Sequence, residues 1–462
     1  MKYETLFTPI RIGNMEVKNR LVVPPMGTNL CNEDNTVGDK FINYWSARAK
    51  GGWGLLIVEV TAIDPLGLAA PRVPALYDDK FIPGFKRLAD KVHQYGAKIC
   101  IQLHHAGRQI SSKVIGDKPV APSPIKCPLV QETPHELTTE EVYQLIEQFG
   151  DAALRAREAG IDGVEIHGAH GYLVAQFMSA YSNKRTDEFG GSLENRMRFP
   201  LEIIKNIKRK AGSDYPILFR ISADEFVPGG RKINETRMIA RMLEDAGVDC
   251  IHVSAGVYKS MQYIVAPSSV EPGYLLHFAE EVKKAVDIPV IGVGRITSAK
   301  LAEDAILTGK ADLIAQGRQS LADPEYPKKI AFGNVAEVAP CIGCMQGCIG
   351  LVLAGNDVSC LVNPFCGNEG EMVITPAEEK KKVVIAGGGP AGLEAAWILA
   401  KRGHEVVLFE KEKELGGNYR IGAIPPAKQE ILKALEYYKN MGEKYGVTYR
   451  LGVEATRSEE RR

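Results

Sequence analysis

Short apolar runs alternate with longer amphipathic stretches over roughly the first 330 residues of the chain. Strands of a parallel sheet that is covered on both faces show such uninterrupted runs of Val, Ile and Leu. Helical spacing occurs between most of the runs, for example over Glu140–Ala159, Leu201–Ala211 and Thr236–Ala246. The runs that predict strands are Leu21–Met26, Gly54–Thr61, Lys98–His104, Gly163–His167, Ile217–Ser222, Cys250–Ser254, Pro289–Gly294 and Asp312–Gln316.

This order of strand and helix predicts an α/β fold that begins with a (β/α)8 TIM barrel. A doubly wound open sheet is the alternative, although eight strands would make that sheet unusually large. The pattern changes after Pro340, where cysteines cluster before a new apolar strand over Val383–Ala386. We expect a barrel over residues 1–335, a short iron–sulfur segment over 336–378 and a partial Rossmann-like βαβ dinucleotide-binding unit over 379–462.

The composition excludes several classes of partner. Lys+Arg and Asp+Glu both number 57, so no net charge favours binding to nucleic acid or to an anionic membrane. No apolar run approaches the roughly 18 residues of a membrane span, and the N-terminus lacks the pattern of a secretory signal. We expect a cytoplasmic enzyme that acts on a small molecule, with assembly into a homo-oligomer left open.

The nine cysteines are unevenly distributed, and five of them lie close together near the end of the predicted barrel. A cysteine cluster in a cytoplasmic chain more often binds a metal than forms disulfides. Four thiolates suit a [4Fe–4S] cluster, and structural zinc is the alternative that the spacing leaves open. The five cysteines that lie close together in the sequence are Cys341, Cys344, Cys348, Cys360 and Cys366.

Polar residues stand at the carboxyl ends of the predicted strands, where barrels of this kind have their active sites. Arg220 lies inside an apolar run and needs a partner, because an unpaired buried charge is very costly. Tyr172 can donate a proton at neutral pH, and His167 and His170 can donate hydrogen bonds to an oxygen that gains charge. These groups suit the reduction of a C=C bond conjugated to a carbonyl, whereas a metal site at the two histidines lacks a third ligand.

Two kinds of glycine motif predict binding of phosphate groups. The last two strands end in Gly294-Arg295 and Gly317-Arg318, where glycine allows close approach and arginine neutralises a phosphate. The C-terminal unit has a strand, the motif Gly387-x-Gly389-x-x-Gly392 and a helix, with Glu410 about 20 residues further on. This order of elements is typical of a dinucleotide site that binds the adenosine ribose.

The barrel resembles the old yellow enzyme family, in the branch of 2,4-dienoyl-CoA reductase and 2-enoate reductase. The resemblance extends from about residue 5 to about residue 450. The motifs that carry it are Asn19-Arg20, Pro25-Met26, Gln102-Leu103-x-His105-Ala106-Gly107-Arg108, His167-x-x-His170-Gly171-Tyr172, Asn183-x-Arg185-Thr186-Asp187, Gly190-Gly191-Ser192-Leu193-Glu194-Asn195-Arg196 and Gly317-Arg318 followed by Leu321-Ala322-Asp323-Pro324.

The resemblance implies that the barrel binds FMN, that His167 and His170 hold the substrate carbonyl, and that Tyr172 protonates the carbon alpha to it. It also implies a [4Fe–4S] cluster on Cys341, Cys344, Cys348 and Cys360, with Cys366 outside the ligand set. The residues implied for FMN are Pro25, Met26, Gly27, Gln102, Arg220, Gly294, Arg295, Gly317 and Arg318.

The C-terminal unit resembles the start of an FAD domain, with Gly387, Gly389, Gly392 and Glu410 as FAD-binding residues and NAD(P)H as the electron donor. Relatives continue beyond this point and supply the rest of both nucleotide sites, so the sequence is C-terminally truncated relative to them. The choice between NADH and NADPH, and the binding of FAD by this unit, stay open.

Departures from the family pattern favour a reductase over an amine dehydrogenase. Many relatives have Cys or Thr where Gly27 stands, and the amine-dehydrogenase branch holds FMN covalently through a cysteine there and has Tyr in place of His167. The dienoyl-CoA reductase has Glu in place of His170 and a proton-relay His near Tyr258. The sequence therefore predicts an ene-reductase for an enoate, an enoyl-CoA or an enone. The alternatives are an FMN and iron–sulfur electron-transfer protein and an amine dehydrogenase of the same family.

Overall fold

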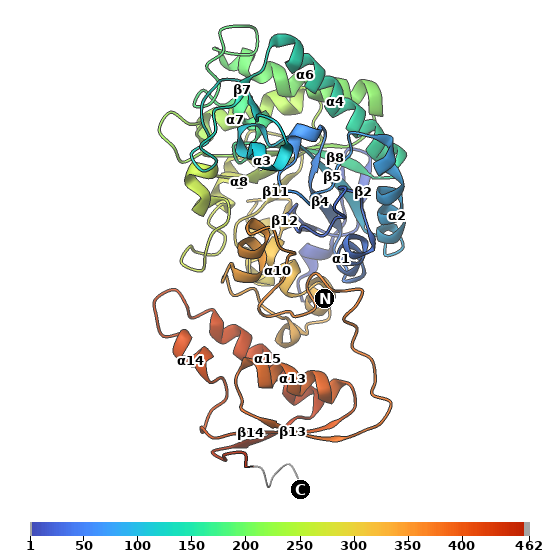
Figure 1. The fold of residues 1–462 in the computed structure, drawn as a ribbon, viewed down its shortest axis with the longest axis vertical. Helices are drawn as coiled ribbons and strands as arrows, with labels where there is room; N and C mark the ends of the chain where they lie inside the picture. Colours follow the sequence, from blue (N-terminus) through green and yellow to red (C-terminus); the bar gives the residue numbers. More distant parts are fainter. Residues whose placement is uncertain (1, 457–462) are drawn as a thin grey trace.

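The computed structural model of the chain describes residues 2–456 and shows a barrel above a smaller C-terminal unit (Figure 1). The eight barrel strands are parallel, and the barrel closes where Ile314 pairs with Leu21. The predicted barrel is therefore confirmed, and the open sheet is wrong. The strands, which overlap the eight predicted runs, are β3 (Leu21–Val23), β4 (Leu55–Ala62), β5 (Lys98–His104), β8 (Gly163–Gly168), β9 (Ile217–Ser222), β10 (Cys250–Ser254), β11 (Val290–Gly292) and β12 (Leu313–Ala315).

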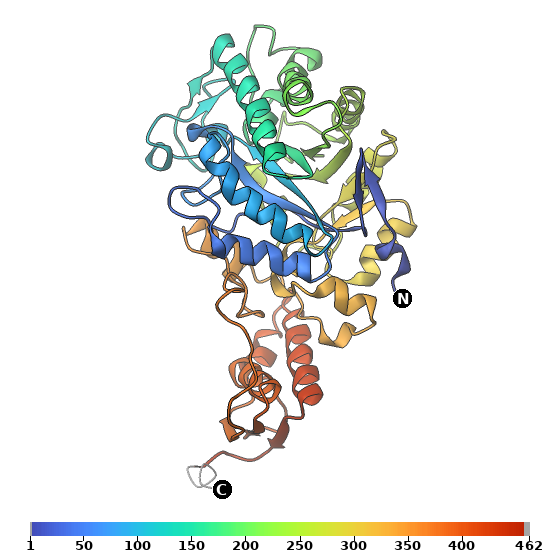
Figure 2. The same cartoon turned by 90° about the vertical axis from the view of Figure 1, so that its right-hand side faces the viewer.

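Helices follow most of the strands and cover the outside of the barrel (Figures 1 and 2). The helix predicted from Leu201 begins earlier, at Leu193, because the Ser192 side chain caps its first turn by accepting the Asn195 N–H at 3.3 Å. The helices are α1 (Asp39–Lys50), α2 (Ile82–His93), α3 (Ser112–Ile115), α4 (Thr139–Glu158), α5 (Leu173–Met178), α6 (Leu193–Ala211), α7 (Ile233–Asp245), α8 (Leu276–Lys283), α9 (Ala299–Leu307), α10 (Gly317–Ala322) and α11 (Tyr326–Ala331).

An N-terminal hairpin of β1 (Ile10–Ile12) and β2 (Met15–Val17) packs against the start of the barrel strands. Its buried side chains form one apolar cluster with inward residues such as Leu55 and Leu218. This cluster fills the amino-terminal end of the barrel. Polar side chains inside the barrel therefore lie toward its carboxyl-terminal end, where the catalytic residues of TIM barrels are found.

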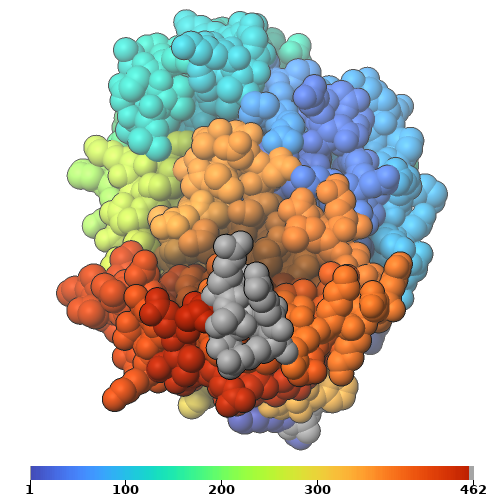
Figure 3. Space-filling model, turned by 60° about the horizontal axis from the view of Figure 1, so that its bottom comes forward, coloured from blue at the N-terminus to red at the C-terminus, as the bar shows by residue number. Residues whose placement is uncertain are grey.

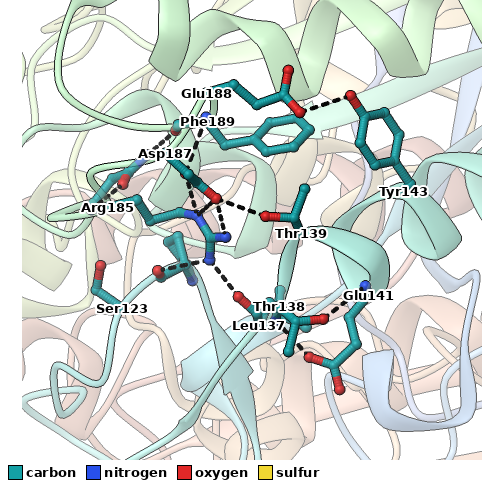
Figure 4. Close-up of polar contacts among 12 residues, drawn as sticks. Ser123, Leu137, Thr138, Thr139, Glu141, Tyr143, Arg185, Asp187, Glu188 and Phe189 are labelled. Carbon is teal, nitrogen blue, oxygen red and sulfur yellow. Dashed lines mark hydrogen bonds and ion pairs between the residues drawn. The ribbon is translucent and has the colours of Figure 1, made fainter.

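The motif around Arg185 has a structural role in the loop that follows α5 (Figure 4). The Arg185 guanidinium donates to the Asp187 carboxylate at 2.5 Å and to the carbonyl of Leu137. The Thr139 hydroxyl donates to the same carboxylate at 3.0 Å, next to the Thr138 N-cap of α4. The motif therefore ties this loop at the barrel mouth to the start of α4 and to the short strands β6 (Val120–Ala121) and β7 (His135–Glu136).

Replacement Asp187→Asn is expected to lower the thermal unfolding midpoint at pH 7 by a few degrees. The hydrogen bonds from Arg185 hold the pKa of the Asp187 carboxyl below its usual range. A carboxyl with a lowered folded-state pKa stabilises the fold above its unfolded pKa of about 3.9, and this contribution is lost as the pH falls through the folded value. The difference between variant and wild type should therefore shrink below about pH 5. Circular dichroism melts between pH 7 and pH 3.5 measure it.

Ser298→Ala is the control, since Ser298 caps α9 without an ionisable partner. Its cost of about 1 kcal/mol should not depend on pH. An Asp187→Asn difference that is constant over the pH range would contradict an ionic role for Asp187.

The C-terminal unit has three parallel strands, β13 (Lys382–Ala386), β14 (Glu405–Glu410) and β15 (Thr448–Leu451). Leu393 and Trp397 of α13 (Pro390–Lys401) pack with Leu435 and Tyr438 of α15 (Ile431–Tyr445), and α14 (Asn418–Gly422) lies before α15. The cysteine segment, with α12 (Leu351–Leu353), lies between this unit and the barrel (Figures 2 and 3). In the part of the chain that the structure describes, no helix has the length and apolarity to span a bilayer.

Candidate active site

One cavity of about 440 Å³ lies at the carboxyl-terminal ends of the barrel strands. It brings together every residue predicted for FMN and for catalysis, although these residues come from six of the eight strand ends and from the turns after them. Cys341 and Cys348 also line it, so the cysteine segment borders the same space. The predicted residues on its wall are Pro25, Met26, Gly27, Gln102, His167, His170, Tyr172, Arg220, Gly294, Arg295, Gly317 and Arg318.

His167 is held as a neutral hydrogen-bond donor. The Ala169 N–H donates to its Nδ1 at 3.3 Å, so the ring proton lies on Nε2. Burial, followed by the charges of His170 and His104, lowers the pKa of His167 well below its usual value. A neutral imidazole with a free N–H can donate to a carbonyl oxygen at neutral pH.

His170 is positioned by two serines. Its backbone has a φ of 61°, and its N–H donates to Ser222 Oγ at 2.9 Å, while its Nε2 lies 2.7 Å from Ser254 Oγ. Burial, followed by the charge of Arg220, lowers the pKa of His170 well below its usual value. The sequence interpretation missed both serines, although their position as the last residues of predicted strands was the available signal.

Tyr172 remains protonated at neutral pH. Burial raises its pKa, against a smaller lowering by the hydrogen bond to Tyr258, whose hydroxyl lies 3.0 Å away. The ring contacts His104 and His167 edge-on, with centroids 4.5 Å and 4.9 Å apart. A protonated phenol beside two neutral imidazoles can transfer a proton to a bound substrate.

Gln102 belongs to a buried network that the sequence interpretation did not anticipate. Its Nε2 donates to Glu165 at 2.7 Å, and His252 Nδ1 lies 2.8 Å from the other oxygen of Glu165. Glu165 therefore turns the amide so that Gln102 Oε1 is an acceptor without a protein partner, and Arg220 Nε is a donor without one. Unsatisfied buried groups cost about 1–3 kcal/mol each. An unpaired acceptor and an unpaired donor on two residues that line one cavity fit the imide edge of a flavin, which carries both N–H and C=O.

The two glycine–arginine turns differ in whether the guanidinium of the arginine has hydrogen-bond partners in the protein. A Cβ at Gly317 would lie 2.6 Å from Met26 Sδ, so a larger residue there would require the Met26 side chain to move. Arg318 Nη1 is buried without a partner. The Arg295 guanidinium instead donates to the Pro267 carbonyl at 2.9 Å and to Glu430 at 2.5 Å. Arg318 is thus the arginine that the structure leaves free to neutralise a phosphate.

The affinity for FMN should depend more on Arg318 than on Arg295. Arg318→Gln removes the unpaired cation and should weaken FMN binding by about 10- to 100-fold, the worth of a hydrogen bond to a charged group. Arg295→Gln should change it by less than about threefold, since its guanidinium is already bound to Glu430. Quenching of FMN fluorescence on titration with flavin-free protein gives both dissociation constants. A larger loss in Arg295→Gln would show that Arg295 leaves Glu430 for the phosphate.

Four cysteines surround a second, smaller cavity that shares Arg318 with the first. Burial raises the pKa of Cys360 to about 12, and the N–H groups of Val362 and Asn363 oppose that rise by donating to its sulfur. Such N–H donors stabilise thiolate ligands. Within residues 2–456 no three His, Cys, Asp or Glu side chains lie close enough to hold a single metal ion. The cysteines that line this cavity are Cys341, Cys344, Cys348 and Cys360.

The glycine motif of the C-terminal unit has the geometry that its residues predict. Gly387 has a φ of 101°, and a Cβ at Gly392 would lie 2.1 Å from the Gly387 carbonyl oxygen. Gly389 is the N-cap of α13, and the Gly388 N–H donates to Glu410 Oε2 at 2.7 Å. The motif lies in the unit beneath the barrel and does not line the main cavity.

Comparisons with known proteins agree with this geometry. The chain is 50% identical to an NADH oxidase of Thermoanaerobacter brockii, over 98% of this chain and 70% of that protein. It is 41% identical to a cinnamate reductase of Clostridium sporogenes, over 99% and 72%. The structure matches a 2-naphthoyl-CoA reductase complex with 2-naphthoyl-CoA at a TM-score of 0.95 and 35% identity, over 98% and 71%. It also matches a histamine dehydrogenase from Rhizobium sp. 4-9 at a TM-score of 0.91 and 29% identity, over 100% and 68%.

Two family models match separate parts of the chain. Residues 385–434 match an NAD(P)-binding Rossmann-like domain. Residues 5–337 match the NADH:flavin oxidoreductase / NADH oxidase family, which supports FMN as the barrel cofactor and confirms the predicted resemblance to the old yellow enzyme branch. The protein is an enzyme, and the chain belongs to the NADH:flavin oxidoreductase / NADH oxidase family.

Proposed function

We propose that this protein is an ene-reductase that saturates the C=C bond of an α,β-unsaturated carbonyl compound. The observation that carries the proposal is the meeting of His167, His170 and Tyr172 in the cavity that also contains Gln102 and Arg220. Two neutral donors and one protonated phenol are the groups that this reduction requires. Cinnamate and naphthoyl-CoA reductases among the similar proteins support the same reaction class.

Each polar residue has a separate task in this proposal. His167 Nε2–H and the His170 ring donate to the carbonyl oxygen, where negative charge grows as the bond is reduced. FMN, when bound against Gln102 and Arg220, would supply the hydride to the carbon beta to the carbonyl. Tyr172 gives its proton to the carbon alpha to the carbonyl, and the Tyr258 hydroxyl, 3.0 Å away, can return a proton to Tyr172.

The remaining parts of the chain suit electron supply from NAD(P)H. Cys341 and Cys348 line both cavities, so a [4Fe–4S] cluster held by the four cysteines would lie beside FMN. Such a cluster would carry electrons one at a time. We propose that Gly387, Gly389, Gly392 and Glu410 contribute to an FAD site in the C-terminal unit.

Amine oxidation is a second candidate, because the structure also resembles a histamine dehydrogenase. Gly27 and His167 oppose it. Gly27 offers no sulfur for a covalent flavin, and the neutral imidazole of His167 replaces the tyrosine of the amine-dehydrogenase branch.

Anaerobic stopped-flow measurements distinguish the two candidates. Protein reduced with dithionite should be reoxidised by enones, unsaturated aldehydes or enoates, with the saturated product identified by mass spectrometry. Oxidised protein mixed with secondary and tertiary amines should keep its flavin absorbance. Flavin bleaching by amines, together with no reoxidation by any unsaturated carbonyl, would replace the first candidate by the second.

A further inference from the structure

The short helical turn Ile349–Gly355, which follows Cys348 and includes α12, is part of the wall of the main cavity. Ile349, Val352, Leu353 and Gly355 line that cavity, although the sequence interpretation treated this segment only as a source of cluster ligands. Val352 faces the position expected to lie beside the flavin, because its Cγ1 is 3.6 Å from where a Cβ on Gly27 would be. The absence of a side chain at Gly27 therefore leaves the valine of the cysteine segment as the nearest group there.

This wall is fastened to the barrel. Asn29 Nδ2 donates to the carbonyls of Val352 and Asn356, both at 3.0 Å, and the Val358 N–H donates to the Thr28 carbonyl at 2.9 Å. Backbone and amide contacts of this kind hold the turn in one place. Val352 consequently has a defined position relative to the strand ends.

A loop of the barrel meets the turn and extends the apolar surface. Ala69, Ala70, Pro71 and Val73 line the same cavity. Arg72, between them, donates to Asp357 at 2.6 Å and so joins the loop to the end of the turn. Loop and turn therefore form one continuous apolar part of the cavity wall.

The polar residues that hold the flavin or meet the substrate carbonyl have assigned roles in the proposed reaction, and this apolar part of the wall has none. Ligand sites are mostly apolar surfaces with a few polar groups that fix orientation. A substrate whose carbonyl is held by His167 and His170 would place the rest of its skeleton against apolar wall. Burial of that skeleton adds affinity in proportion to the apolar area removed from water.

We propose that the Ile349–Gly355 turn is a specificity-determining wall, with Val352 as its central residue, and that it receives an apolar, aryl-sized substituent of the substrate. This inference rests on the proposed ene-reductase function. The cysteine segment then has two tasks, since it holds the cluster cysteines and also shapes the substrate site.

The test compares two enones that differ only in one substituent, 4-phenyl-3-buten-2-one and 3-penten-2-one. Val352→Phe should lower kcat/KM for the phenyl compound at least about tenfold and for the methyl compound less than about threefold. Val352→Ala, which removes contacts without adding bulk, should lower the preference for the phenyl compound by about 3- to 10-fold. Leu351→Ala is the matched control, because Leu351 lies in the same turn, is 36% exposed and does not line the cavity.

A measurement without turnover separates this inference from the proposed function. Phenol and 4-phenylphenol bind to the oxidised holoenzyme, and Val352→Phe should reduce the preference for 4-phenylphenol by about tenfold. Iron content and bound FMN are measured in each variant to show an intact protein. Equal changes for both members of each pair, or no change, would overturn the inference. If neither enone reoxidises the wild type while the preference among phenols still falls in Val352→Phe, the proposed function fails and the wall assignment stands.

Discussion

Replacement of Tyr172 by Phe is expected to slow reoxidation of the reduced protein by an enone by about 10²–10⁴-fold, the usual worth of a positioned acid. The substitution removes the hydroxyl that lies 3.0 Å from Tyr258 and keeps the ring that packs against His104 and His167. Binding of FMN and reduction of the bound flavin should therefore be unchanged. Stopped-flow absorbance at the flavin band, with dithionite-reduced protein, measures the two half-reactions separately.

Tyr258→Phe is the comparison that tests the relay. Tyr258 has a pKa raised well above its usual value by burial, so it too is protonated at neutral pH. If Tyr258 only returns a proton to Tyr172, its loss should slow reoxidation far less than the loss of Tyr172. Wild-type rates in Tyr172→Phe, with a large loss in Tyr258→Phe, would assign the acid to Tyr258 instead.

Removal of one predicted cluster ligand is expected to abolish the iron–sulfur cluster. Wild-type protein prepared without oxygen should contain about four iron and four sulfide per chain, and Cys344→Ala should contain close to none. Cys344 lines the small cavity together with Cys341, Cys348 and Cys360, so each thiol is one of four that face a common space. Iron and sulfide analysis, with the visible absorbance of the protein, gives the result.

Cys366→Ala is the matched control within the same segment. Cys366 is fully buried and does not line the small cavity, and burial raises the pKa of its thiol far above the usual value. It should therefore remain a thiol, and its replacement should leave iron and sulfide unchanged. Stoichiometric zinc without sulfide in the wild type would contradict the cluster, and loss of iron in Cys366→Ala would contradict the ligand set.

The elements of the barrel follow from local sequence. Each strand is a short run of apolar residues because both of its faces are covered, and this pattern depends only on neighbours in the chain. Helix starts were predicted less well. The sequence interpretation began α6 at Leu201, directly after Pro200, whereas the helix begins eight residues before that proline, at the Ser192 cap. The same local reasoning placed the candidate residues at strand ends, and the closed barrel then brought them together.

Partners that are distant in the chain could not be predicted in this way. Glu165 orients Gln102 and contacts His252, Arg295 binds Glu430, and Val352 faces Gly27. Each of these contacts joins residues that are 63 or more positions apart, and nothing in the local pattern marks the two members as a pair.

The sequence by itself determined the eight strands of the barrel, most of the helices between them, the chemistry available at the strand ends and the family. Only the tertiary structure decided which of these groups are free to act. Hydrophobic periodicity and capping are properties of adjacent residues, whereas hydrogen-bond partners, burial and the resulting pKa shifts depend on how separate segments pack. Hence Arg318 is unpaired while Arg295 is bound, and His167 is a neutral donor because it is buried.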